Sequence, residues 1–233
     1  MSQMERMNKE RAWPFAVGSG GTLGMATTVL AAAAGLWRWR PGRASSALFG
    51  LWGALWLLLL YFFRDPQRAA PAAAGLVVGP GDGELVEIVR ERETRFLNAE
   101  VVRLSIFLSI TDVHVQRAPL GGRVTAVVHQ PGRFLQAFRP EASQVNESIA
   151  MVLETEYGRI LIKQIAGILA RRCVNYAQPG QQLATGQRFG LIRFGSRLDL
   201  CLPPDAGLLV QVGDKIVGGV TPIAQMASPP RHP

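Results

Sequence analysis

The chain has 233 residues, of which 48% are hydrophobic, and a formal net charge of +8. This length suits one catalytic domain with an anchor rather than several domains. The basic residues are scattered instead of forming a dense run, so we predict no nucleic-acid partner. Two cysteines, Cys173 and Cys201, cannot form a disulfide framework and lie in no metal-ligand spacing. The simpler interpretation is a reducing compartment and no metal site, although a single bridge stays open.

Two uncharged apolar stretches follow a short N-terminal tail of residues 1–13. They cover 24 residues at 14–37 and 17 residues at 47–63. As helices they would be roughly 36 Å and roughly 26 Å long, at about 1.5 Å per residue. The hydrocarbon core of a bilayer is about 30 Å thick, so the first can span it and the second is borderline. The sequence therefore predicts a membrane hairpin over 14–63, with a re-entrant hairpin in one leaflet as the alternative.

Positive charge is concentrated around these segments. Residues 1–68 contain eight Lys or Arg against three Asp or Glu, which favours contact with anionic lipid. The positive-inside bias is five residues flanking the hairpin against three in its turn, namely Arg6, Lys9, Arg11, Arg64 and Arg68 against Arg38, Arg40 and Arg43. We expect a cell (inner) membrane protein whose ends and catalytic domain face the cytoplasm.

The pattern changes after a linker at 64–75 that is rich in alanine and proline. Apolar residues alternate with polar ones over 102–110, which is typical of a strand with one buried face. Similar short runs separated by glycines occur at 84–90, 122–128, 149–155, 159–165, 198–202 and 207–212. The expected fold class is mainly β, a barrel or sandwich over 76–225, followed by a flexible tail at 226–233. Residues 212–219 also look like the turn of a lipoyl-type barrel-sandwich hybrid.

Histidine is the side chain best suited to act as a base near neutral pH, and this chain has only three. His232 belongs to the C-terminal tail. His129 precedes Gln-Pro-Gly at a strand end, where a solvated turn residue is expected. His114 follows the alternating strand at 102–110, either as an ordinary strand-end histidine or as a base. Because the other two are poorly placed, His114 is the better candidate.

The pair Gly195-Ser196, within an apolar strand-like segment, could be an autocatalytic cleavage point. The serine hydroxyl would attack the Gly195 carbonyl and convert the amide into an ester. β-Elimination would then leave dehydroalanine, which hydrolyses to a pyruvoyl group. Glycine suits the acyl position because it has no Cβ and tolerates a distorted backbone. On its own, however, such a pair is usually a turn.

Asp82 lies between two glycines in the segment 79–83, where aspartate most often forms a turn. Asp112, two residues before His114, could share a strand face with this histidine, although at a strand end it is more typical of a cap or turn residue.

Four segments together resemble the short bacterial and archaeal type of phosphatidylserine decarboxylase, over residues 60–225. They are the cleavage site Phe194-Gly195-Ser196-Arg197, the junction 61–66 (Tyr-Phe-Phe-Arg-Asp-Pro), the motif 80–83 (Pro-Gly-Asp-Gly) and the histidine motif 108–119. Asn146-Glu147 resembles a further short motif, but a polar loop would contain the same residues. The longer type usually has Thr after the serine and a second His three residues after the first. This chain has Arg197 and Arg117 there, and their roles stay open.

The resemblance implies self-cleavage into chains 1–195 and 196–233, which would remain together as a heterodimer, with a higher oligomer open. It assigns catalytic roles to Ser196, His114 and Asp82, with the Asp82 carboxylate orienting the His114 imidazole and Asp112 as a competitor for that role. It also implies a covalent pyruvoyl cofactor formed from Ser196. This group would take the amine of phosphatidylserine as a Schiff base, and loss of CO2 would give phosphatidylethanolamine.

Two other classes of protein fit parts of the pattern. A membrane-bound serine hydrolase could use the same Asp82, His114 and Ser196 but would keep an intact chain. A non-enzymatic barrel-sandwich adaptor of a membrane complex would neither cleave itself nor react with serine-directed probes. The chain lacks the long heptad repeats that such adaptors usually contain, which counts against the adaptor.

Overall fold

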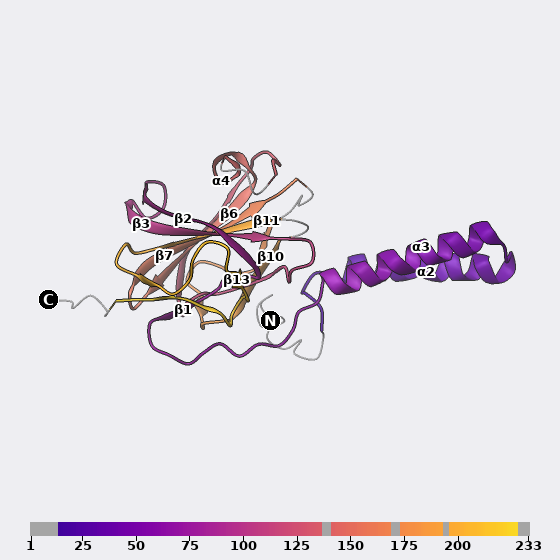
Figure 1. Cartoon of the computed structure of the whole chain (residues 1–233), viewed down its shortest axis with the longest axis horizontal. Helices are drawn as coiled ribbons and strands as arrows, with labels where there is room; N and C mark the ends of the chain where they lie inside the picture. The colour runs from indigo at the N-terminus through magenta and orange to yellow at the C-terminus, as the bar shows by residue number, and fades with distance from the viewer. Residues whose placement is uncertain (1–13, 137–140, 169–172, 193–195, 228–233) are drawn as a thin grey trace. The chain divides into compact units, whose positions relative to one another are not determined.

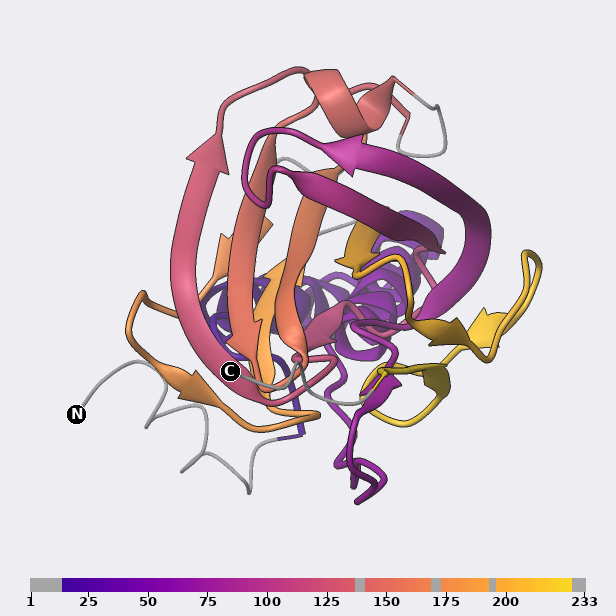
Figure 2. The same ribbon diagram turned by 90° about the vertical axis from the view of Figure 1, so that its left-hand side faces the viewer.

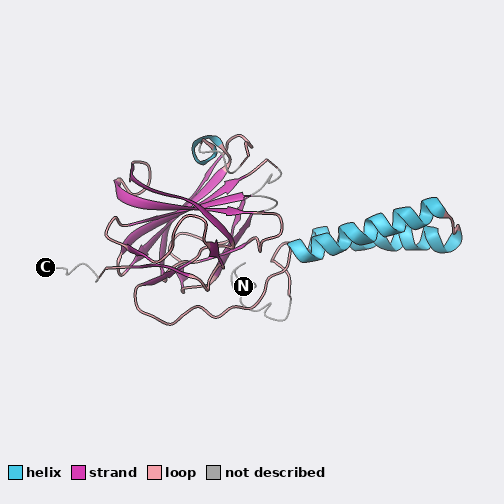
Figure 3. Ribbon diagram, viewed as in Figure 1, coloured by secondary structure: helices cyan, strands magenta, loops and turns pink. Residues whose placement is uncertain are grey.

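The computed structural model describes residues 14–136, 141–168, 173–192 and 196–227 (Figure 1). The chain divides into two compact units, with the boundary between Pro66 and Gln67. The first contains a helical hairpin and the second contains the β-strands (Figure 3).

The hairpin consists of α2 (Gly20–Trp39) and α3 (Arg43–Phe62), which pack side by side. Trp37 stacks on Phe49 with ring centroids 5.5 Å apart, and Trp56 Nε1 donates a hydrogen bond of 3.0 Å to Thr27 Oγ1. Both helices have 20 residues and are long and apolar enough to cross a membrane.

The helix bounds differ from the expected 14–37 and 47–63, because the absence of charged residues does not by itself determine where a helix begins or ends. Before α2, the chain is extended at Phe15 and has a left-handed glycine at Gly18 (φ 82°). Before α3, the turn is short, and the Ser45 hydroxyl donates to the Gly42 carbonyl at 3.0 Å inside the first helical turn. The helix therefore already begins at Arg43.

The chain segments that enter and leave the hairpin are paired with each other. Phe15 and Arg64 form an antiparallel bridge, and the Ala16 amide donates to the Phe63 carbonyl at 2.7 Å. The Asp65 amide donates to the Pro14 carbonyl at 2.8 Å. Both ends of the hairpin consequently lie together at its base.

The β unit is built on one curled, antiparallel eight-stranded sheet (Figure 2). Its strand order is β13 (Lys215–Ile216), β2 (Gly83–Glu93), β3 (Ala99–Leu108), β11 (Ser196–Leu202), β7 (Gly158–Ala166), β6 (Ser148–Thr155), β5 (Gly122–Gln130) and β9 (Gln182–Leu183). Strand β11 is therefore central, although it comes late in the sequence.

Two three-stranded sheets complete this unit. One has the order β1 (Leu76–Val78), β14 (Pro222–Gln225) and β12 (Gly207–Leu208), and the other has β4 (Val115–Arg117), β10 (Arg188–Ile192) and β8 (Cys173–Asn175). The only helix described after residue 70 is the short α4 (Ala142–Val145). The prediction of a mainly β domain is confirmed, and its strands run from Leu76 to Gln225. The strand found in the expected run 207–212 is shorter, because only Gly207 and Leu208 are paired with β14.

The two faces of β11 are chemically different. Ser196, Leu198 and Leu200 share one face, since side chains alternate along a strand. Leu198 is paired with Gln164 of β7, whose side chain donates to Gln116 of β4 at 2.9 Å. This face therefore packs against the sheet β4-β10-β8. The opposite face carries Arg197, Asp199 and Cys201.

Candidate active site

Ser196 is the first residue of β11, paired with Leu108 of β3 on one side and Ala166 of β7 on the other. Its side chain is fully buried, and its hydroxyl has no hydrogen-bond partner in the described part of the chain. Burying an unpaired hydroxyl costs about 1–3 kcal/mol, so such groups need an explanation. A reactive nucleophile is one.

The predicted cleavage point falls where the chain passes from one sheet to another. Strand β10 ends at Ile192 in the sheet β4-β10-β8, and β11 begins at Ser196 in the eight-stranded sheet. Gly195 lies outside the described residues. Four residue steps separate Ile192 from Ser196, so their Cα atoms are at most about 14 Å apart.

His114 lies beside the start of this connection. Its side chain is fully buried, and its backbone carbonyl accepts a hydrogen bond from the Ile192 amide at 3.3 Å. Its Nδ1 is 2.9 Å from the backbone oxygen of Asp112. A carbonyl oxygen can only accept, so Nδ1 must carry the proton, and Nε2 of the neutral ring is the basic nitrogen. The tautomer is thus suited to a base.

A buried chain of side-chain amides fixes the backbone at His114. Gln116 Nε2 donates to the His114 carbonyl at 2.7 Å, and Gln164 Nε2 donates to Gln116 Oε1 at 2.9 Å. Asn175 Nδ2 in turn donates to Gln164 Oε1 at 3.2 Å. Sequence reasoning missed these residues, although a glutamine inside the apolar run 159–165 was a visible signal.

Asp82 is bound by an arginine and a backbone amide. Arg68 donates to both carboxylate oxygens, at 2.5 and 2.8 Å, and the Gly218 amide donates to Oδ1 at 2.8 Å. A Cβ at Gly218 would lie 2.7 Å from Gly81 Cα, so glycine is required for this close approach. In the described part of the chain, the hydrogen bonds of the Asp82 carboxylate do not include His114. Its place in the relay stays a prediction.

The rival carboxylate, Asp112, has the turn role that its position indicates. Its Oδ2 accepts a hydrogen bond from the Ser109 amide at 2.8 Å and closes the turn after β3. Its backbone oxygen is the acceptor that lies 2.9 Å from His114 Nδ1.

Of the other two histidines, His129 is among the described residues. His129 on β5 is about half exposed, with Nε2 3.4 Å from a carboxylate oxygen of Glu147. His232 lies outside the described residues. For His129, the expectation of a solvated side chain fits this exposure.

Asn146 has a structural role that the sequence did not predict. It is buried, and its Nδ2 donates to the Ala166 and Leu135 carbonyls, both at 2.8 Å. Ala166 is the strand partner of Ser196, so Asn146 attaches the chain around Leu135 to the Ser196 end of the sheet.

The two arginines that distinguish the short-type motifs are both buried. Arg117 donates from Nη1 to the Gly186 carbonyl at 3.3 Å, and its Cδ would lie 2.6 Å from a Cβ at Gly219. Arg197 points to the opposite face of β11 from Ser196, where it is bound to Asp199, Glu87 and Ser105.

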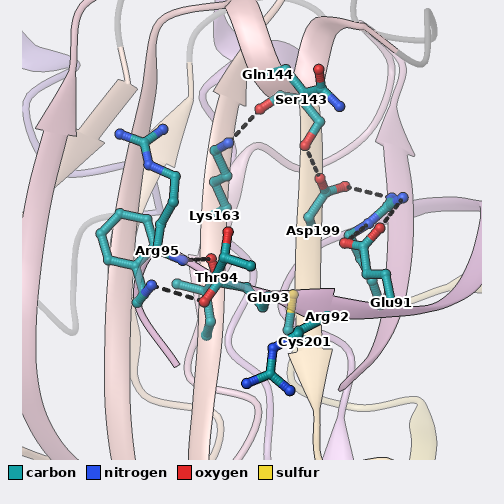
Figure 4. Close-up of a pocket in the computed structure, with 13 residues that line it drawn as sticks. Glu91, Arg92, Glu93, Thr94, Arg95, Ser143, Gln144, Lys163, Asp199 and Cys201 are labelled. Carbon is teal, nitrogen blue, oxygen red and sulfur yellow. Dashed lines mark hydrogen bonds and ion pairs between the residues drawn. The ribbon is translucent and has the colours of Figure 1, made fainter. Parts of the chain in front are cut away.

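A cavity of about 370 Å³ also lies on that opposite face (Figure 4). Asp199, Cys201 and Lys163 are among its lining residues. The Lys163 ammonium donates to the Ser143 carbonyl, and burial lowers the pKa of this lysine. Because Ser196 faces the other way, this cavity is not the place where Ser196 would react.

The described residues form no candidate metal site, and their two thiols are buried. No group of three His, Cys, Asp or Glu side chains within those ranges could hold a metal ion. Cys173 and Cys201 are free and buried, and burial raises the pKa of both thiols well above the ordinary value.

Comparison with known proteins identifies the family. Residues 55–224 match the family model for phosphatidylserine decarboxylase. A phosphatidylserine decarboxylase proenzyme of Pelobacter propionicus is 47% identical over 182 residues, covering 78% of this chain and 81% of the relative. Proteins of the same name from Symbiobacterium thermophilum and Beijerinckia indica are 41% and 42% identical, covering 97% and 88% of this chain and 99% and 84% of the relatives. The chain therefore belongs to the phosphatidylserine decarboxylase family.

Proposed function

We propose that this protein converts phosphatidylserine into phosphatidylethanolamine and CO2 after cutting its own chain between Gly195 and Ser196. The observation that carries the proposal is the buried Ser196 hydroxyl, which has no hydrogen-bond partner in the described part of the chain. It lies at the start of a central strand, at the position that the family resemblance assigns to cleavage. The relatives are named proenzymes, which fits a chain that must be processed.

The self-cleavage uses groups of this chain alone. His114 Nε2 accepts the Ser196 hydroxyl proton while the oxygen attacks the Gly195 carbonyl carbon. The C–N bond breaks, and an ester and a free amine on residue 196 result. Loss of the Cα proton of residue 196 then expels the Gly195 carboxylate and leaves dehydroalanine. Its imine tautomer takes up water and releases ammonia, which leaves a pyruvoyl group on residue 196.

The Ser196 oxygen is buried and has no hydrogen-bond partner among the described residues, which fits its conversion into such a group. The pyruvoyl group supplies an electron sink for the electron pair left behind when CO2 departs. The strand partners Leu108 and Ala166 hold residue 196 in place on both sides. His114 would return a proton to the substrate carbon after decarboxylation.

The hairpin supports a membrane location for this reaction. Two helices long and apolar enough to cross a bilayer precede the β unit, and the lipid substrate resides in the membrane. We place the β unit on the cytoplasmic side of the cell membrane, either with a spanning hairpin or with one that dips into a single leaflet. Anionic lipid, including phosphatidylserine itself, is the expected partner. Chains 1–195 and 196–233 would stay together as a heterodimer.

Intact-mass spectrometry of the purified full chain under denaturing conditions tests the proposal. We expect two chains, the smaller of about 4 kDa at roughly 110 Da per residue and blocked at its N-terminus. Phosphatidylserine in mixed micelles should release CO2 with this protein and not with Ser196→Ala. A single uncleaved species after prolonged incubation would refute self-cleavage. If that species also reacted with a fluorophosphonate, a serine hydrolase would be the better description.

A further inference from the structure

We propose that Arg197 is a positioning residue that keeps residue 196 inside the sheet after the chain has been cut. This inference rests on the proposed function, since it concerns the cleaved form. It assigns a role to an arginine that the cleavage chemistry itself does not use.

The Arg197 side chain is 2% exposed and makes three short hydrogen bonds. Its Nε donates to Asp199 Oδ1 at 2.6 Å, and its Nη2 donates to Glu87 Oε2 and to Ser105 Oγ, both at 2.8 Å. Hydrogen bonds between ionised groups are about twice as strong as neutral ones. The residue directly after the cleavage point is thus bound by its side chain as well as by its backbone.

A second arginine completes the cluster. Arg103 Nη1 donates to the same two acceptors, Glu87 Oε2 at 2.7 Å and Ser105 Oγ at 2.6 Å, while its Nε donates to Glu91 Oε1 at 2.8 Å. Burial by itself raises the pKa of Glu87, but the hydrogen bonds and charges of Arg103 and Arg197 outweigh it and lower that pKa. Glu87 is therefore an anion between two cations.

Cleavage would divide this cluster between two chains. Arg197 and Asp199 belong to the product 196–233, whereas Glu87, Ser105 and Arg103 belong to the product 1–195. A new chain end tends to fray, because nothing covalent holds it. Fraying from residue 196 would have to break the hydrogen bonds of the buried Arg197 guanidinium to Glu87 and Ser105, which is unfavourable for a buried cation. The ion pair thereby replaces the covalent tether that cleavage removes.

One carboxylate of the cluster, Asp199, has a further hydrogen-bond partner outside the cluster. Ser143 of α4 donates from its hydroxyl to Asp199 Oδ2 at 2.7 Å, and its backbone carbonyl accepts from Lys163 (Figure 4). Asp199 thus keeps a second partner, so Arg197 is bound to a carboxylate that is itself fixed.

The test is a comparison of Arg197→Met in the cleaved protein and in an uncleaved Ser196→Ala background, with hydrogen exchange at the amides of β11 as the readout. In the cleaved full-length protein, the amides nearest residue 196 should exchange roughly 10- to 100-fold faster than in the parent, since opening needs no ion pair to break. In the Ser196→Ala background the increase should be much smaller, because the chain is still continuous. Equal increases in both backgrounds, or none in the cleaved form, would overturn the inference.

Activity provides the second readout. We expect kcat of cleaved Arg197→Met to fall roughly 10- to 100-fold with KM nearly unchanged, because a small displacement of the reacting group costs rate rather than binding. Arg197→Lys, which keeps the charge, should recover part of the loss. Arg103→Met is the matched control: it removes a cation from the same cluster without touching the residue next to 196, and β11 exchange near residue 196 should change less.

A charge-balanced pair covers the case in which Arg197→Met does not fold. Arg197→Met combined with Glu87→Gln removes one charge of each sign and should show the same fast exchange in the cleaved form. Failure of the proposed function is separately visible, since the parent protein would then not be cleaved at all. If the parent is cleaved and the charge-balanced variant behaves like it, the positioning role is wrong.

Discussion

Nδ1 of the His114 imidazole lies 2.9 Å from the backbone oxygen of Asp112, so a main-chain acceptor orients the ring. This contact fixes the tautomer, because a carbonyl oxygen can only accept a hydrogen bond and Nδ1 must then donate. With the proton on Nδ1, Nε2 is the nitrogen that would accept the Ser196 hydroxyl proton in the proposed self-cleavage.

Removing the base should slow self-cleavage severely. We predict that His114→Ala reduces the rate by about 10²- to 10⁴-fold, the usual contribution of a general base. The rate is read from the growth of the small chain in intact-mass spectra. His129→Ala, at an exposed position, should cleave like the parent protein. The reverse pattern would show that the base has been assigned to the wrong histidine.

The orientation by a backbone oxygen makes a second prediction about Asp112. Asp112→Asn should cleave at nearly the normal rate, because the backbone oxygen is retained and the asparagine Oδ1 can still accept from the Ser109 amide. The same mass-spectrometric time course applies. A loss as large as that of His114→Ala would mean that the Asp112 carboxylate takes part in the chemistry.

Asp82 and Arg68 form a pair whose variants separate two roles of Asp82. As a member of the relay, Asp82 should be more important than its arginine partner, so Asp82→Asn is expected to slow cleavage more than Arg68→Gln, and less than His114→Ala. The losses are not additive in such groups, so each variant is compared with the parent. Equal losses for Asp82→Asn and Arg68→Gln would instead assign the pair a role in holding the loop at 79–83.

The Glu87 pKa predicts an acid-sensitive β unit. Its folded-state pKa is held below the ordinary 4.5, so its contribution to stability is present above that value and is lost as the pH falls through the folded-state pKa. The free energy of unfolding of the uncleaved Ser196→Ala protein in detergent should therefore drop below about pH 4.5, as measured by urea denaturation. Glu87→Gln should be less stable at neutral pH and depend less on acid. An identical pH dependence in both proteins would contradict this assignment.

The topology of the hairpin can be tested at its turn. Ala44 is exposed at the start of α3, whereas the neighbouring Ser45 is buried, so Ala44→Cys is the better probe position. In a background without Cys173 and Cys201, labelling by an impermeant maleimide from the periplasm would indicate a spanning hairpin, and protection would indicate one that dips into the cytoplasmic leaflet. Protease added to intact spheroplasts should leave the β unit undigested. Digestion would show that this unit lies on the periplasmic side of the membrane.

Much of the fold was predictable because its long strands have regular alternation. The run at 102–110 corresponds closely to β3, and the runs at 149–155 and 159–165 to β6 and β7. Strands such as β9 and β13 have only two residues, which is too short for any periodicity. The start of α3 was missed because Arg43 is charged yet belongs to the helix.

The candidate site was predictable in composition but not in its contacts. Ser196 and His114 both lie at the passage from β10 to β11, where a base and a nucleophile could meet. The partners of Arg197 could not be predicted, because Glu87 and Ser105 reach it only through the register of three strands that are distant in sequence. Similarly, no local pattern shows that Asp112 orients His114 through its main chain.

The central position of β11 has a consequence for how the mature protein would assemble. The product 196–233 would supply the strand that separates β3 from β7, so its removal would split the eight-stranded sheet into two pieces with newly exposed edges. Such edges invite aggregation. The two products would then behave as complementing fragments that unfold in one step, and neither should reach its native structure when produced without the other. Maturation would in this sense be irreversible, because a product that is separated from the other after cleavage could not refold on its own.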